Sequence, residues 1–190
     1  SQNNADAFVR YATMEIDGAM NSLTRSLAIA MYRDGSGSLG TISANPSGAK
    51  VLTLTNPQDI SNFEVGMQLN IASAATAAIR SNFTTSGNTA TIDAVDRDAG
   101  TITTKVNMHA DASAGDHLFQ VGDAHGGASF KKLRGLEAWI PSSAPGGSDS
   151  FFGVNRSVDA TRLGGIRVDG SSLPIEEALI TAASRVAREG

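Results

Sequence analysis

Three histidines and three aspartates in the middle of the chain are the side chains best suited to metal chemistry. They are His109, His117 and His125, with Asp111, Asp116 and Asp123 close by in the sequence. Two histidines and a carboxylate suffice to hold zinc or non-haem iron. The histidines are eight residues apart, a spacing that fits neither one helix face nor the short-spaced ligand pairs of common zinc sites. We therefore expect solvated loop histidines and no metal site. An enzyme that uses this cluster is the less favoured alternative, which bound metal would reveal.

A glycine pattern at 35–40 has the spacing G-x-G-x-x-G, which is typical of dinucleotide-binding loops. In those loops the glycines lie between a strand and the N-terminus of a helix, so that the helix amides face the pyrophosphate. Here the glycines follow a helical pattern and precede a strand pattern. The order is reversed, so we expect a helix stop and a hinge.

The segment Asp96–Gly100 resembles the opening of a calcium-binding loop. Such a loop needs further oxygen ligands, typically closed by a glutamate at position twelve. That position is Asn107, and the next glutamate is Glu137. Polar residues at the tip of a hairpin explain the segment better. We therefore assign no catalytic, cofactor-binding or metal residue, and expect no cofactor.

The first structural element predicted is a long helix over about Ala5–Arg33. Its apolar residues recur at steps of three and four along one face, with Met20 and Met31 widening the stripe. The members of this stripe are Phe8, Ala12, Ile16, Ala19, Leu23, Leu27 and Ala30. The run Asp34–Gly37 ends the helix. A helix of this length in a small chain is typical of a strut.

From about 44 to 123 the pattern changes to short strands. Lys50–Thr55 alternates, and apolar residues occupy every second position from Phe63 to Ile71. Strands at 89–95 and 101–106 flank a five-residue turn, and 115–121 supplies another strand. We expect a small barrel or sandwich in which 73–86 is a loop.

The last part of the chain combines glycine-rich loops with one more helix. Pro141–Ser150 is predicted to be a loop. Pro174 at the first turn and the following two glutamates mark the start of a helix that ends near Arg188. We expect its buried stripe to contain Ile175, Leu179, Ala182 or Ala183, and Val186.

Composition and charge narrow the classes of partner. The net charge is -4 and lysines and arginines are few, which disfavours a general nucleic-acid surface or an anionic-membrane surface. No apolar run reaches the ~18 residues of a membrane span. There is no cysteine, so disulfides and thiolate ligands are excluded. The first residues have no signal-peptide pattern and lead at once into the helix, so we expect a fragment of something longer.

Three segments, Ala30–Gly37, Phe151–Gly165 and Pro174–Ile180, resemble parts of the major capsid proteins of tailed bacteriophages and prophages, which have the HK-type capsid fold. The run Ala30–Gly37 resembles the end of the spine helix of these proteins, where a glycine-rich strand follows. The runs Phe151–Gly165 and Pro174–Ile180 resemble coat-protein segments that follow the spine helix. The likeness covers about 5–40 and 133–190, and its motifs are glycine-rich turns and one helix.

The resemblance implies an α+β chain with three parts. Residues 1–43 would be the spine helix and its connecting turn, 44–125 an inserted β-rich domain, and 126–190 part of the axial domain. The N-terminal arm, extended loop and peripheral strands of the family would lie outside this sequence, which looks like the middle of a subunit. The cross-linking lysine found in part of the family cannot be assigned here.

The function implied is that of a structural subunit of a capsid shell around packaged DNA. The chain would be no enzyme, and would act by homotypic assembly into capsomers in the virion, after assembly in the bacterial host cytoplasm. Scaffolding or decoration proteins are further partners, without sequence-specific nucleic-acid binding or membrane association. The loop 155–165, with Arg156, Asp159 and Arg162, either contacts neighbouring copies or is simply solvated. Alternatives are a bacterial encapsulating-shell protein of the same fold, and a module that binds a virion or host-surface ligand.

Overall fold

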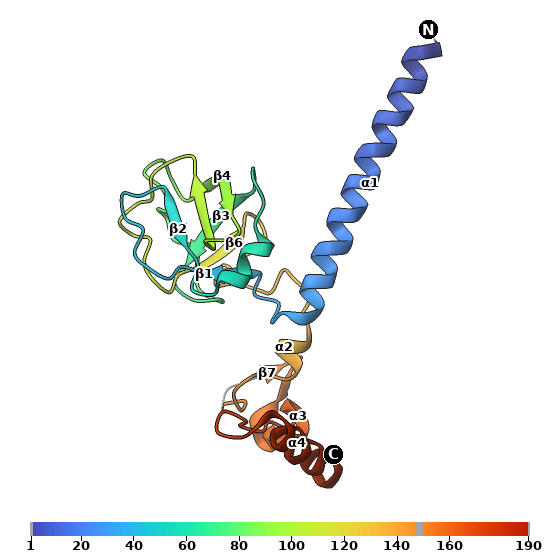
Figure 1. Ribbon diagram of the computed structural model, residues 1–190, viewed down its shortest axis with the longest axis vertical. Helices are drawn as coiled ribbons and strands as arrows, with labels where there is room; N and C mark the ends of the chain where they lie inside the picture. The colour runs from blue at the N-terminus through green and yellow to red at the C-terminus, as the bar shows by residue number, and fades with distance from the viewer. Residues whose placement is uncertain (1, 147–149, 190) are drawn as a thin grey trace. The chain divides into compact units, whose positions relative to one another are not determined.

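The computed structural model describes residues 2–146 and 150–189, which divide into two compact units. One unit combines residues 1–34 with 134–190, and we call it the helical unit. The other spans Gly35–Leu133, and we call it the barrel unit. The chain is therefore a mixed α+β protein in which a continuous β-rich segment separates the two parts of the helical unit (Figure 1).

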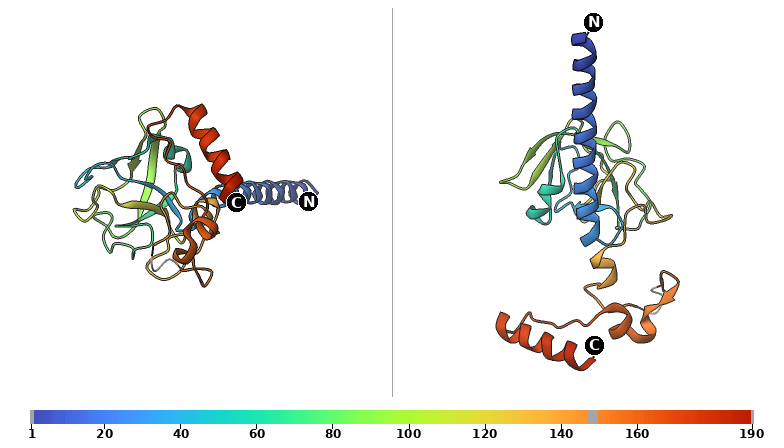
Figure 2. Two further views of the ribbon diagram at one scale, coloured as in Figure 1. Left: turned by 90° about the horizontal axis from the view of Figure 1, so that it is seen from below. Right: turned by 90° about the vertical axis from the view of Figure 1, so that its right-hand side faces the viewer.

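In the residues that the structure describes, the helical unit contains four helices, one short 3-10 helix and one hairpin. These elements are α1 (Gln2–Tyr32), α2 (Leu136–Trp139), β7 (Ser150–Phe151), β8 (Val154–Asn155), η2 (Arg156–Asp159), α3 (Ala160–Gly164) and α4 (Ile175–Glu189). The first and last of these confirm the two predicted helices, and α1 is continuous in both views of Figure 2. The loop predicted at Pro141–Ser150 is irregular up to residue 146, residues 147–149 lie outside the described residues, and Ser150 begins β7.

The barrel unit contains six strands and one 3-10 helix. They are β1 (Ser38–Thr41), β2 (Val51–Thr53), η1 (Pro57–Asn62), β3 (Gln68–Ala72), β4 (Ala90–Asp96), β5 (Thr101–Thr104) and β6 (His117–Gln120). All ladders in the sheet are antiparallel, in the order β1-β6-β3-β4-β5-β2. The predicted hairpin is confirmed as β4 and β5.

The two outer strands of this order close the sheet on itself. Just beyond β1 and β2, Ile42 bridges Leu54. The amide of Ser43 donates to the carbonyl of Thr53, and the amide of Thr55 donates to the carbonyl of Thr41, both at 2.9 Å. Closure pairs the backbone groups that an open sheet would leave at its edges. Of the predicted barrel or sandwich, these hydrogen bonds fit the barrel.

The core of the barrel is lined by fully buried aliphatic and aromatic side chains. It includes Ile42, Leu52, Phe63, Leu69, Ile71, Phe83, Ile92, Ile102, Met108 and Leu118. A smaller cluster of Ala72, Phe119 and Ala124 packs against Ala77 and Ile79 of the segment 73–86. The segment 73–86 forms no helix or strand, as predicted, and it packs over apolar side chains of β3 and β6.

Two sequence interpretations of this unit are corrected. The alternating pattern from Phe63 to Ile71 is a strand only over Gln68–Ala72, because Glu64–Met67 form a turn in which the amide of Met67 donates to the carbonyl of Glu64. Val65 is accordingly 67% exposed. The barrel unit is also longer than the predicted inserted domain, because β1, which we had placed in the connecting segment, pairs with β6.

Candidate association surface

The three histidines singled out in the sequence lie in different surroundings. The Nδ1 atom of His117 is 2.9 Å from the hydroxyl of Ser38, and the ring of His125 meets the edge of Phe130 at 4.6 Å between centroids. His109 lies beside Asp111, with 3.3 Å between Nδ1 and Oδ2. Within residues 2–146 and 150–189, no group of three or more histidine, cysteine or acidic side chains is placed to hold a metal ion.

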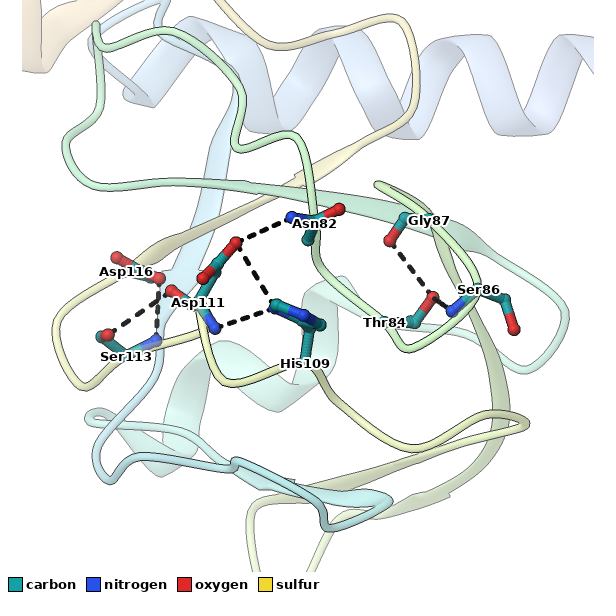
Figure 3. A network of polar contacts seen from close by, with 8 residues as sticks. All are labelled: Asn82, Thr84, Ser86, Gly87, His109, Asp111, Ser113 and Asp116. Carbon is teal, nitrogen blue, oxygen red and sulfur yellow. Dashed lines mark hydrogen bonds and ion pairs between the residues drawn. The ribbon is translucent and has the colours of Figure 1, made fainter.

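Two of the predicted aspartates take part in a polar network at the loops of the barrel unit (Figure 3). Asn82 donates to Asp111 Oδ2 at 2.9 Å, and Asp111 donates its amide to His109 Nδ1 at 3.2 Å. Asp116, which is buried, accepts from the guanidinium of Arg80 at 2.7 Å and from the amide of Ser113 at 2.9 Å. The hydrogen bond from Arg80 to Asp116 is the main reason why the pKa of Arg80 is raised. The network ties the loop 73–88 to the segment 107–116 and is structural in character.

The two other candidate ligand loops are also used by the fold. In the glycine pattern, a Cβ atom at Gly37 would collide with the carbonyl oxygen of Asp123, and φ is +84°. Glycine is required there by close backbone packing. In the predicted calcium-like turn, Oδ1 of Asp96 accepts from the amides of Asp98 at 3.0 Å and Ala99 at 2.9 Å. This carboxylate shapes the hairpin turn.

The helical unit exposes many large apolar side chains along the apolar stripe of α1. With ~100° of rotation per residue, its members fall within about 140° of the helix circumference, and no charged residue lies among them. Val9 falls on the same face at ~100° per residue. With it, seven large side chains of the stripe are between 47% and 71% exposed: Phe8, Val9, Ile16, Met20, Leu23, Leu27 and Met31. We call this set the α1 stripe.

Among the described residues of α1, only those at its C-terminal end are closely packed within the unit. The amide of Gly135 donates to the carbonyl of Arg33 at 2.8 Å, and a Cβ atom at Gly135 would collide with the carbonyl oxygens of Ala30 and Met31. This close approach lets α2 (Leu136–Trp139) begin against the end of α1, where Ala30 is buried. The long remainder of the α1 stripe faces solvent.

The predicted buried stripe of α4 is wrong for its three large residues, whereas Ala182 is half-buried as predicted. Ile175, Leu179 and Val186 are 78%, 64% and 53% exposed. The helix instead turns Ala178, Ala182 and Arg185 toward its own unit, and all three are half-buried. Arg185 donates to the carbonyl of Arg167 at 2.8 Å, and a Cβ atom at Gly170 would lie 3.2 Å from that of Ala178. The small side chains allow the segment 167–170 to approach closely, and the larger apolar residues are left outside.

An aromatic cluster at the β7–β8 hairpin was not anticipated. Phe151 is buried between two guanidinium groups, at 4.1 Å from that of Arg134 and 4.3 Å from that of Arg156. The ring of Trp139 meets Phe151 edge-on at 4.8 Å. The sequence signal was the Phe-Phe-Gly run followed closely by Arg156, which periodicity alone does not identify.

The three charged residues proposed to contact neighbours have different roles. Arg156 is corrected: it is buried, and it donates to the carbonyl of Ala138 at 2.8 Å. Asp159 caps α3 by accepting from the amide of Arg162 at 3.1 Å. The side chain of Arg162 is 80% exposed, and its Nε lies 3.9 Å from Asp159 Oδ2. Arg162 and the carboxylate of Asp159, which is 46% exposed, remain open to a neighbouring molecule.

Comparisons with known proteins assign no family to this chain. No protein-family model matches it, and no curated protein and no solved structure is significantly similar to it. Among the described residues, no helix combines the length and apolar character needed to cross a membrane.

Proposed function

We propose that this chain is a structural subunit of a viral capsid shell, of the tailed-phage or prophage kind, that acts by homotypic assembly around packaged DNA. The observation that carries the proposal is the solvent-exposed α1 stripe. The resemblance of 30–37, 151–165 and 174–180 to capsid-protein segments is the reason why we propose a capsid as the assembly that forms. On this proposal the protein resides in the virion after assembly in the host cytoplasm, with the HK-type fold as its architecture.

A helix with an apolar face as exposed as that of α1 is expected to bury this face against another protein surface. Helices in water owe most of their stability to packing of an apolar face, and exposed apolar patches of this extent mark interaction sites. Burying what remains exposed of the seven large side chains of the α1 stripe would contribute on the order of 10 kcal/mol. Association costs about 4–15 kcal/mol in lost freedom. The balance favours contacts that form at high local concentration and are reinforced by many copies, which is the regime of a shell.

The net charge of the chain bears on how it would associate with the enclosed DNA. With a net charge of -4, the chain offers little general attraction for phosphate groups. Enclosure without sequence-specific contact is the mode of DNA association that fits this charge. Specific recognition of bases would need clustered basic and polar side chains directed at the grooves.

The experiment that tests the proposal maps association onto the α1 stripe. The double variant Ile16→Asp/Leu23→Asp places two charges in the stripe, whereas Asn21→Asp adds a charge on the polar face of the same helix. We expect multi-angle light scattering to show concentration-dependent oligomers for the wild-type chain and for Asn21→Asp. The stripe variant should stay monomeric. Equal association of all three proteins would contradict the proposal, and helical circular dichroism checks that α1 still forms.

A further inference from the structure

The turn between β7 and β8 presents a phenylalanine on an unfavourable backbone conformation. Phe152 and Gly153 are the two loop residues, with φ of 50° and 82°, as in a type I′ turn. Such turns favour asparagine or glycine at the first position. In the described part of the chain, Phe152 is the single non-glycine residue with positive φ. Phe152 remains 71% exposed, so its contacts within the chain cover only a small part of it. Strain of this kind is concentrated at binding sites.

The support beneath Phe152 is pre-organised. Its ring lies 4.7 Å from that of Phe151 and 5.9 Å from that of Trp139, and the guanidinium of Arg134 is 5.9 Å from its centroid. Arg156 stacks on the ring of Phe151 in the same cluster and donates to the carbonyl of Ala138. Aromatic side chains and arginine dominate the energetics of protein interfaces, and a rigid anchor loses little entropy when it binds. We call Phe152, Trp139 and Arg134 the tip.

A complementary surface is found on the first two turns of α4. Ile175, Leu179 and Ile180 are 78%, 64% and 70% exposed, and Glu176 and Glu177 lie between them in sequence and are also exposed. The tip combines aromatic rings with a guanidinium group, and this surface combines aliphatic side chains with carboxylates. The two therefore match in apolar character and are opposite in charge.

We propose that the tip of one copy docks on the first two turns of α4 of a second copy, with Arg134 directed toward Glu176 and Glu177. This inference rests on the proposed function, homotypic assembly, and names one of its contacts. Because the two surfaces differ, the contact is heterologous: each copy carries one tip and one acceptor. Contacts of this type extend head to tail and close into rings when the rotation between copies allows it.

The test uses two variants that each remove one half of the contact. Phe152→Asn removes the ring and places a residue that the turn favours, so the hairpin is expected to fold at least as well as before. Leu179→Asp places a charge on the acceptor, and Ser184→Asp, on another face of α4, is its control. By sedimentation velocity, each of the first two variants should have an association constant at least about tenfold lower than that of wild type. Ser184→Asp should behave as wild type.

Mixing the two defective variants distinguishes a tip–acceptor pair from any other contact. The mixture still contains one intact acceptor, on Phe152→Asn, and one intact tip, on Leu179→Asp. We expect the mixture to recover the contact in a one-to-one complex, although each variant alone associates about tenfold more weakly than wild type. Loss of association without recovery in the mixture would overturn the inference. So would wild-type association that both variants leave unchanged, in which case the proposed function stands. A wild-type chain that stays monomeric up to about 1 mM would overturn both.

Discussion

The buried side chain of Arg156 provides the sharpest test of how the helical unit is held together. It donates to the carbonyls of Ala138 at 2.8 Å and Trp139 at 3.3 Å, where α2 ends, and its guanidinium stacks 4.3 Å from the centroid of Phe151. Replacement by alanine removes the charged donor from two carbonyls and one of the two cations that enclose the ring. We predict that Arg156→Ala selectively destabilises this unit.

The magnitude follows from the contacts that are lost. A hydrogen bond with a charged donor contributes about 1.5–3 kcal/mol, and a partly desolvated cation–π contact about 0.5–2 kcal/mol. Both carbonyls accept from the same nitrogen, Nη1, so they count as one shared hydrogen bond. The sum is then about 2–5 kcal/mol, and about 3 kcal/mol corresponds to about a hundredfold in the unfolding equilibrium. Arg156→Lys keeps the charge and loses the planar fork, so it should lie between wild type and alanine. Arg162→Ala removes an equal charge from an exposed site, and should change stability by about 0.5 kcal/mol or less.

The assay exploits the single tryptophan of the chain. Trp139 contacts Phe151 in this cluster, so its fluorescence reports on the helical unit during urea unfolding. The expected result is a large fall in the midpoint for Arg156→Ala and an unchanged midpoint for Arg162→Ala. Similar small shifts for both variants would refute the reasoning that Arg156 supports the aromatic cluster.

Three further predictions concern the remaining elements. Gly18 lies inside α1 with open space around it, so Gly18→Ala should stabilise the helix by about 0.5–1 kcal/mol; slower amide exchange along α1 checks this, and unchanged exchange contradicts it. Thr104 is fully buried and its hydroxyl lies within hydrogen-bonding distance of the carbonyls of Lys50 and Val106. Thr104→Val should therefore destabilise the barrel by about 1–2 kcal/mol in a thermal melt, and an equal or higher melting temperature would argue against this role. Expressed alone, residues 35–133 should give dispersed amide signals and a cooperative melt, with a stability of about 5–10 kcal/mol; a collapsed, non-cooperative product would show that the unit depends on the rest of the chain.

Local patterns predicted those elements whose residues meet mainly their sequence neighbours. The α1 helix, the β4–β5 hairpin and α4 were each identified close to their observed bounds, because periodicity and turn residues act over a few positions. The barrel was expected from its strands, yet its closure depends on the pairing of 41–43 with 53–55. Long-range pairing of this kind leaves no mark on local periodicity.

The errors have one physical origin, which is that an apolar pattern does not say what covers it. Ile175, Leu179 and Val186 were predicted to be buried, whereas the helix packs through Ala178, Ala182 and Arg185. The segment 167–170 lies close to the small side chain of Ala178, and Arg185 donates to the carbonyl of Arg167. The alternation at 63–71 continued through a turn, where Phe63 is buried and Val65 is exposed. The aromatic cluster could not be foreseen, since it brings Arg134 and Trp139 to Phe151 from separate segments.

Self-assembly is the central claim, and direct imaging of the protein tests it most simply. Negative-stain electron microscopy of the chain, prepared across about 1 µM to 1 mM, covers association free energies of about -8 to -4 kcal/mol. The account predicts small oligomers of repeating shape in which copies are related by rotation, with their fraction rising with concentration. Isolated single copies at every concentration would contradict it.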